Sequence, residues 1–191
     1  MKYINKHFTN TLERKQSKFI AHLLPFIEYE NKLKELKQQH PKARHFVTAF
    51  RYLNEYNQIV EHSSDDGEPK GTSGKPSLMV LQGQNIINTA VIIVRYFGGT
   101  KLGTGGLVRA YSDAVNKVLD LAELVEYKEE LITKIFFNYE YIRKIEYECE
   151  KLDINIIKKE FESLVVFDIK GSKKDINELL INLDRIIKLT S

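Results

Sequence analysis

The stretch that decides the fold runs from residue 89 to residue 109 and reads Thr89-Ala90-Val91-Ile92-Ile93-Val94-Arg95-Tyr96-Phe97-Gly98-Gly99-Thr100-Lys101-Leu102-Gly103-Thr104-Gly105-Gly106-Leu107-Val108-Arg109. Its first six residues are almost purely apolar and β-branched, a pattern typical of a strand buried on both faces. From Gly98 to Gly106, five of nine residues are glycine, which indicates that the chain turns sharply there or is closely approached. The stretch therefore predicts a buried strand, a glycine loop and the start of a helix.

The residues after the glycine loop carry one apolar stripe at helical spacing. The stripe comprises Leu107, Ala110, Tyr111, Ala114, Val115, Val118, Leu121 and Ala122. The opposite side carries Arg109, Asp113, Lys117 and Asp120. We therefore expect a long helix that packs on the buried strand.

A strand, a glycine loop and a helix start together point free backbone N–H groups at an anion, and cationic side chains would add to their effect. The candidate anion-binding residues of this segment are Arg95, Gly98, Gly99, Lys101, Gly103, Thr104, Gly105, Gly106 and Arg109. The segment is not a Walker loop, because Lys101 precedes Gly103, and no Gly-x-Gly-x-x-Gly spacing of a dinucleotide fingerprint fits. This argues against a nucleoside triphosphatase. The alternative is that the glycines only tighten a strand-to-helix turn.

A second loop is acidic where the first is basic. It reads Ser63-Ser64-Asp65-Asp66-Gly67-Glu68-Pro69-Lys70-Gly71-Thr72-Ser73-Gly74-Lys75-Pro76. Asp65, Asp66 and Glu68 could hold a divalent cation, act as acid/base groups or contact a basic partner, and a solvated acidic turn is the alternative. Thr72, a further candidate ligand-binding residue, or Ser73 could cap a short helix whose first turn contains Pro76.

His45 and Arg51 lie six residues apart in a predicted strand over residues 43–52, so both side chains face the same side. We count both as extensions of the anion-binding surface, with a neutral core histidine as the alternative for His45. No nucleophilic Ser or Cys stands in a hydrolase motif. The single cysteine, Cys149, is a predicted core residue that cannot form an intramolecular disulfide.

Metal-binding motifs are not evident in the sequence. The five histidines are His7, His22, His40, His45 and His62. They are dispersed and lack paired metal-ligand spacing, so we expect no zinc finger, no metal site and no cofactor.

The pattern outside these loops predicts two α+β domains, residues 1–125 and 126–191. Predicted strands over residues 19–25 and 43–52 flank a predicted helix over residues 29–39, so the first domain begins as a βαβ unit. The second domain, with no proline and one glycine, predicts the order strand, helix, strand, strand, helix. Its last helix begins near Ser172, with Asp175 in a capping arrangement. The βαββα order is that of a ferredoxin-like domain with its helices on one sheet face.

Composition agrees with a folded protein in the cytoplasm. The 191 residues are 42% hydrophobic and 29% charged, with a net charge of +3. Residues 1–125 hold 17 basic against 12 acidic residues, and residues 126–191 hold 12 against 14, so the basic excess belongs to the first domain. No apolar run approaches the about 20 residues that span a bilayer, and no apolar signal core is present near residue 1. We therefore expect a cytoplasmic protein without a membrane partner.

Several motifs taken together resemble the IMPACT family in its bacterial YigZ-type branch. They are the run from Asp65 to Pro69 with Thr72, Gly74 and Pro76, the run from Val94 to Gly99, and the run from Leu102 to Tyr111. The resemblance implies an N-terminal βαβ domain related to a small-subunit ribosomal protein, a domain of elongation factor G and the GHMP kinases. It implies a C-terminal domain similar to the ferredoxin-like last domain of that elongation factor. Family members in eukaryotes regulate translation by competing for an activator of a starvation-sensing initiation-factor kinase.

These observations support three classes of function. The leading hypothesis is a non-catalytic, translation-associated regulator that binds phosphates of RNA or the ribosome, or a translation factor, through the glycine-rich anion-binding loop. The alternative is an enzyme or sensor for a small phosphorylated or carboxylated ligand, with Asp65, Asp66 or Glu68 as a base or metal ligand. The third is a module that only binds a protein partner.

Overall fold

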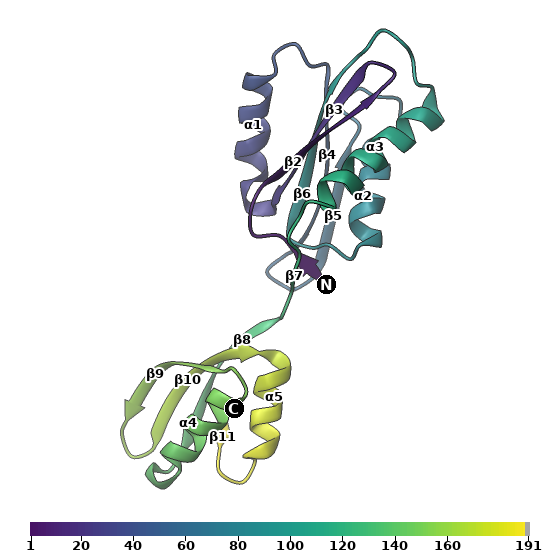
Figure 1. Ribbon diagram of the computed structural model, residues 1–191. Helices are drawn as coiled ribbons and strands as arrows, with labels where there is room; N and C mark the ends of the chain where they lie inside the picture. Colours follow the sequence, from purple (N-terminus) through teal and green to yellow (C-terminus); the bar gives the residue numbers. More distant parts are fainter. Residues whose placement is uncertain (190–191) are drawn as a thin grey trace. The chain divides into compact units, whose positions relative to one another are not determined.

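The computed structural model describes residues 1–189 and divides into two compact units, Met1–Tyr127 and Lys128–Ser191 (Figure 1). Each unit has its own sheet and its own buried clusters. Both units mix strands and helices, which confirms the predicted α+β class. No helix within the described residues is long and apolar enough to cross a bilayer.

The first unit is built on a five-stranded sheet in the order β2-β3-β6-β4-β5, in which every neighbouring pair is antiparallel. Its strands are β2 (Phe8–Arg14), β3 (Ser17–Pro25), β4 (His45–Leu53), β5 (Ile59–Ser64) and β6 (Thr89–Tyr96). The predicted buried strand is the central strand β6, and its residues are buried from Thr89 to Arg95. A short pair, β1 (Lys2–Tyr3) with β7 (Val125–Glu126), joins the two ends of the unit.

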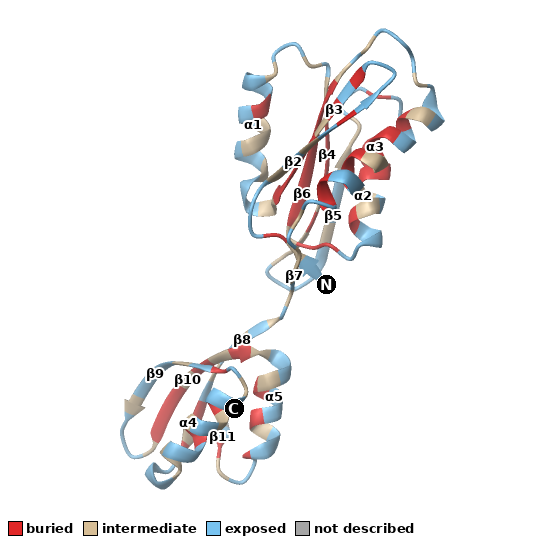
Figure 2. Ribbon diagram, viewed as in Figure 1, coloured by how far each residue is buried: buried red, intermediate tan, exposed pale blue. Residues whose placement is uncertain are grey.

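Helices cover both faces of this sheet (Figure 1). The helix α1 (Tyr29–Gln39), preceded by the 3-10 turn η1 (Phe26–Glu28), packs on one face around Leu36, Ile92 and Val94. On the other face, α2 (Gly74–Gly83) and α3 (Thr104–Leu119) enclose the larger core. Figure 2 shows the strands between the helix layers as mostly buried. Residues on one face of the sheet therefore pack against α1, and residues on the other face pack against α2 and α3.

The apolar stripe of α3 is confirmed, with one correction at its end. Residues from Leu107 to Val118 on the stripe are buried against the sheet. The helix ends at Leu119, however, so Leu121 lies beyond it and is 58% exposed. The prediction extended the helix too far because an apolar side chain in the following turn happened to continue the spacing.

The second unit is a four-stranded antiparallel sheet in the order β11-β8-β10-β9. Its elements are β8 (Glu130–Phe137), η2 (Tyr139–Tyr141), α4 (Ile142–Lys151), β9 (Asn155–Phe161), β10 (Val165–Ser172), α5 (Lys173–Asn182) and β11 (Lys188–Leu189). This confirms the predicted βαββα order and adds a short final strand. The core joins Ile145 of α4 and Ile176 of α5 to Phe167 of β10.

Two predicted details of the second unit are also confirmed. The Ser172 hydroxyl caps α5 by accepting a hydrogen bond from the Asp175 amide at 3.1 Å. Cys149 is buried in the core, where burial first and then Glu146 and Glu148 raise the pKa of its thiol to about 11. A thiol with a raised pKa stays protonated at neutral pH, so Cys149 is a structural residue and not a nucleophile.

Candidate functional site

Three residues of the α3 face lie side by side at one end of the first sheet. Arg95 of β6 pairs in register with Phe19 of β3 on one side and with His45 of β4 on the other. The guanidinium carbon of Arg95 lies 5.3 Å from the centre of the Phe19 ring and 5.8 Å from that of Phe97. Arg95 is only 6% exposed. The prediction of Arg95 as an accessible cation is therefore wrong, because it occupies the buried face of the central strand.

The partner of Arg95 is Glu68 of the acidic loop. The Nη1 group of Arg95 and the hydroxyl of Tyr111 on α3 both donate to Glu68 Oε1, the latter at 2.7 Å. Burial, followed by the charge and hydrogen bond of Glu68, raises the pKa of Tyr111, so the phenol remains a donor. The Nε atom of Arg95 is buried without a partner among the described residues. Glu68 is thus part of an internal network that ties the acidic loop to β6 and α3.

His45 lies at the edge of this network. Its Nε2 atom is 4.0 Å from Glu68 Oε1, and its Nδ1 atom is 2.8 Å from the carbonyl oxygen of Asp66. Because a carbonyl oxygen only accepts, Nδ1 carries the proton of that hydrogen bond. The Asp66 carboxylate accepts a hydrogen bond from the Phe46 amide at 2.6 Å. His45 is half-buried and oriented by the acidic loop, so the structure differs from both predicted roles, a core histidine and an open surface residue.

The Asp65 carboxylate closes the acidic loop on itself. It accepts hydrogen bonds from the amides of Gly71 at 2.7 Å, Ser73 at 3.1 Å and Gly74 at 2.8 Å, and from the Ser73 hydroxyl at 2.6 Å. Desolvation opposes the charge of Asp65, but the bonds from Ser73, Gly71 and Gly74 outweigh it and lower the pKa of Asp65. Asp65 thus organises the loop and the start of α2.

No group of three or more His, Cys, Asp or Glu within residues 1–189 is arranged to hold a metal ion.

The side chains of Thr72 and Arg51 also donate hydrogen bonds to backbone carbonyl groups of the protein. The Thr72 hydroxyl donates to the Pro69 carbonyl at 2.7 Å, and the Ser73 hydroxyl binds Asp65, so neither side chain caps α2. Arg51 lies on the same face as His45, as predicted, but it is buried and ion-paired with Glu61 at 2.7 Å. It also donates to the carbonyl of Ile86 at 2.8 Å. The prediction of Arg51 as a surface cation is wrong, because β4 runs beneath α2 at that point.

Three glycines of the basic loop are explained by the fold alone. A Cβ atom on Gly98 would lie 2.0 Å from the carbonyl carbon of Gln16, and the Gly98 amide donates to the Ser17 hydroxyl at 3.1 Å. Gly99 and Gly103 have φ values of +88° and +73°, which favour glycine. At these three positions glycine is explained by the alternative stated above, in which the glycines only tighten the turn from strand to helix.

Gly105 is different, because neither its conformation nor its surroundings require glycine. Its φ is not positive, and a Cβ atom there would meet no atom within 4 Å. The helix α3 has no side-chain cap, and its first internal bond runs from the Leu107 amide to the Gly103 carbonyl at 2.9 Å. The amides of Thr104, Gly105 and Gly106 have no hydrogen-bond partner within residues 1–189. These N–H groups therefore lie open at the positive end of α3.

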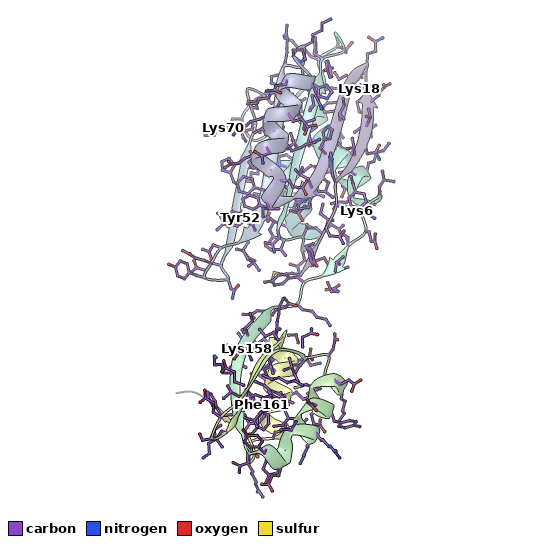
Figure 3. All side chains as sticks on the ribbon, turned by 90° about the vertical axis from the view of Figure 1, so that its left-hand side faces the viewer. Lys6, Lys18, Tyr52, Lys70, Lys158 and Phe161 are labelled. Carbon is purple, nitrogen blue, oxygen red and sulfur yellow. The ribbon has the colours of Figure 1, made fainter. Side chains whose placement is uncertain are left out.

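A groove of about 570 Å³ lies along this helix start. Its lining residues are Glu13, Arg14, Lys15, Leu102, Gly106, Arg109, Ala110 and Asp113. Arg14 pairs with Asp113 at 2.8 Å, whereas Lys15, Lys101 and Arg109 are exposed and form no ion pair with any described residue. Lys18 of β3 is labelled near the same end of the sheet in Figure 3. The two basic loop residues predicted here, Lys101 and Arg109, thus remain accessible.

Sequence reasoning missed Lys15, since only the β2–β3 hairpin brings residues 13–15 beside α3. The acidic loop contacts Arg95 of β6 and Tyr111 of α3, but none of its residues lines the groove. The structure therefore separates the predicted site into a buried network around Glu68 and an open groove at the start of α3.

Comparisons with known proteins agree with these motifs. The model of the Impact N-terminal domain matches residues 15–119, a range that includes both loops and α3. An IMPACT family member of Haemophilus influenzae is 36% identical over 167 residues, which cover 86% of this chain and 81% of that protein. The IMPACT family member YvyE of Bacillus subtilis is 34% identical over 165 residues, with coverage of 85% and 75%. A crystal structure of a hypothetical protein is similar over 100% of this chain and 96% of that one, with 27% identity and a TM-score of 0.65.

Proposed function

The chain belongs to the IMPACT family, and from this premise we propose that it is a non-catalytic, translation-associated regulator in the cytoplasm that binds phosphates of RNA or the ribosome. The binding surface is the groove at the start of α3. The observation that carries the proposal is the uncapped start of α3, whose Gly106 lines the groove together with the unpaired cations Lys15 and Arg109, while Lys101 lies exposed in the preceding loop.

The physical chemistry of this groove favours phosphate. Backbone N–H groups at a helix start bind anions through direct hydrogen bonds and the helix dipole. Arg109 can add a bidentate contact, and Lys15 and Lys101 add charge. Gly105 lets a ligand approach the backbone closely, although glycine within a helix costs about 1 kcal/mol relative to alanine. Such contacts position a nucleic acid without reading its bases.

Family membership and the excess of basic residues in the first domain also support a phosphate-bearing ligand. The sequence resemblance relates this domain to a ribosomal protein and to a domain of elongation factor G, and the second unit has the ferredoxin-like order expected for that factor's last domain. The excess of 17 basic over 12 acidic residues in residues 1–125 is suited to a polyanionic partner.

Binding of RNA or ribosomes as a function of salt tests this proposal. We expect wild-type affinity to fall steeply with ionic strength, and Lys101→Glu together with Arg109→Glu to weaken binding and flatten the salt slope by about 1.4 for single-stranded RNA. Lys34→Glu together with Lys42→Glu, the same change of charge at two exposed lysines outside the groove, is the control and should retain more affinity. Binding that is indifferent to salt, or equal in all variants, would refute the proposal.

A second candidate is a small phosphorylated or carboxylated ligand, because the groove volume of about 570 Å³ lies within the usual range for small-molecule sites. Thermal-shift measurements with nucleotides, phosphosugars and carboxylates, with and without Mg²⁺, test it. A shift that is lost in Arg109→Glu would favour the small ligand. No shift combined with salt-dependent RNA binding would favour the regulator, and nuclease-resistant capture of a protein would favour a protein partner.

A further inference from the structure

Two histidines that are distant in sequence meet on the α1 face of the first unit. Thr9 of the edge strand β2 pairs in register with His22 of β3, and His7 immediately precedes β2. Alternate residues of a strand share a face, so His7 and Thr9 both lie beside His22. Figure 3 looks at the unit from the side of α1, and the labelled Lys6 marks where this segment enters the sheet.

Three polar atoms of these residues form an equilateral triangle. His7 Nε2 lies 3.2 Å from His22 Nδ1, and Thr9 Oγ1 lies 3.2 Å from each of them. When both rings are neutral, directed hydrogen bonds can occupy at most two of these three edges, because each ring nitrogen supplies either one proton or one lone pair and the Thr9 hydroxyl supplies only one proton. In a tetrahedral site with metal–nitrogen bonds of about 2.05 Å, neighbouring ligand atoms are about 3.3 Å apart. The spacing of these three atoms matches that of neighbouring ligand atoms around one metal ion.

The state of the two imidazoles suits this role. His22 is 7% exposed, and burial first, then the charges of His7 and Lys32, lower its pKa to about 4. Burial and then Lys32 also lower the pKa of His7. Imidazole binds metal ions in its neutral form. His7 is exposed, which gives an ion access from solvent and leaves room for water ligands.

The helix above the triangle brings a cation close to the histidines. Lys32 of α1 pairs with Glu35 at 3.0 Å, yet its charge adds to the effect of burial in lowering the pKa of both rings and so opposes a bound cation. The Nε2 atom of His22 is buried with no partner among the described residues. Histidine ligands usually donate their other N–H to an outer partner, and its loss typically weakens binding by about 10–100-fold. We therefore expect a moderate affinity.

We propose that His7 Nε2, His22 Nδ1 and Thr9 Oγ1 bind one divalent transition-metal ion of the class that prefers imidazole, namely Cu²⁺, Ni²⁺ or Zn²⁺. Water completes the coordination. We do not expect Mg²⁺ or Ca²⁺ to bind here, because these ions prefer sites made of oxygen donors. The bound ion connects the edge strand β2 to β3, independently of the groove on the opposite face of the sheet.

Calorimetric titration of the full, tag-free chain with each metal tests the site. We expect one ion per chain, with Cu²⁺ bound more tightly than Ni²⁺ or Zn²⁺, and no saturable binding of Mg²⁺. His7→Ala and His22→Asn should each lower the affinity by about tenfold or more, and Thr9→Val by less. His62→Ala removes another exposed histidine and should leave the titration unchanged.

A spectroscopic measurement gives a second readout. The Cu²⁺-loaded chain should show hyperfine splitting from imidazole nitrogens in its electron paramagnetic resonance spectrum, and His7→Ala should reduce it. His7 is exposed, so this variant remains informative even if His22→Asn disturbs folding. Absence of saturable metal binding, or a titration unchanged by His7→Ala, would overturn the proposal. Binding lost in His62→Ala instead would show that the ion sits on other surface histidines and would also overturn it.

Discussion

Glycine has two separate physical roles within one loop of this protein. Gly98 packs against the backbone of the β2–β3 turn, where a Cβ atom would come within 2.0 Å of Gln16. Gly105 has open space in front of it and lies in the first turn of α3. The first glycine is required by the protein itself, whereas the second has no such requirement and leaves the backbone accessible.

This difference predicts opposite results for two alanine substitutions. Gly98→Ala should lower the free energy of unfolding by about 2–3 kcal/mol, because the hairpin turn must shift to admit the methyl group. Gly105→Ala should leave stability unchanged or raise it by up to about 1 kcal/mol, because alanine favours the helix. Urea denaturation measures both values. Equal destabilisation by the two substitutions would contradict the assignment of roles.

Asp65 predicts a pH dependence of stability. Its pKa is lowered in the folded chain, so its contribution is complete above the unfolded value of 3.8 and is lost as pH falls through the lower folded pKa. Asp65→Asn should therefore be less stable than wild type by about 1–2 kcal/mol at neutral pH, since its bonds are no longer charge-assisted. The difference should shrink as the pH falls below 3.8. Denaturation at several pH values measures this, and a difference that grows on acidification would contradict it.

At the scale of the element, the helices α3 and α5 begin in different ways. The amide of Asp175 in α5 is held by the Ser172 hydroxyl, whereas α3 follows Gly103 and has no side-chain cap. A side-chain cap satisfies one of the free N–H groups at a helix start, and an uncapped start leaves that group as well for solvent or a ligand. The contrast explains why the groove of α3, and not the start of α5, is the candidate anion site.

The same contrast predicts the effect of removing a hydroxyl group at each helix start. Ser172→Ala should destabilise the second unit by about 1 kcal/mol through loss of the cap. Thr104→Ala, at the start of α3, should leave stability nearly unchanged, because its hydroxyl makes no hydrogen bond with the described residues. Hydrogen exchange of α5 and α3 amides in the two variants measures these effects. An equal loss of protection at α3 in Thr104→Ala would contradict the uncapped start.

At the scale of the whole molecule, each buried cluster among the described residues draws on one unit only. Phe167→Ala should remove a fully buried ring from the second core and destabilise that unit by about 3–5 kcal/mol. Hydrogen-exchange protection should fall in residues 128–189 and remain in β6. Phe161→Ala, at a ring that is 57% exposed, is the matched control and should change little. Loss of protection in β6 as well would show that the two cores unfold together.

Prediction from sequence succeeded where the signal was local and strong. Residues 89–94, the stripe of α3 and the βαββα order all rest on periodicities that a buried strand or an amphipathic helix must have. The edge strand β2 was not predicted, because an edge strand exposes most of its side chains and needs no apolar run. The short strands β1, β7 and β11 were missed for a different reason, since two residues are too few to show a periodicity.

The candidate site was only partly predictable. Lys101 and Arg109 are accessible, as expected from a basic loop before a helix, whereas the acidic loop contacts Arg95 of β6 and Tyr111 of α3 instead of lining the groove. The exposure of Arg95 and Arg51 was predicted wrongly. Residue type suggests a surface cation in both cases, but each side chain falls on the buried face of its strand, where a carboxylate neutralises it.

The amino-acid sequence by itself determined the buried strand, the glycine loop, the helix that follows and the ferredoxin-like order of the second unit. The spacing of apolar residues and the placement of glycines are local patterns among neighbouring residues, so they predict strands, turns and helices without knowledge of the fold. Which polar groups are left open follows from the tertiary structure. Arg95 meets Glu68 across 27 residues because the loop between β5 and α2 contacts β6, and His7 meets His22 across 15 because strand register aligns β2 with β3. Register depends on the packing of all strands at once, and no local pattern encodes it.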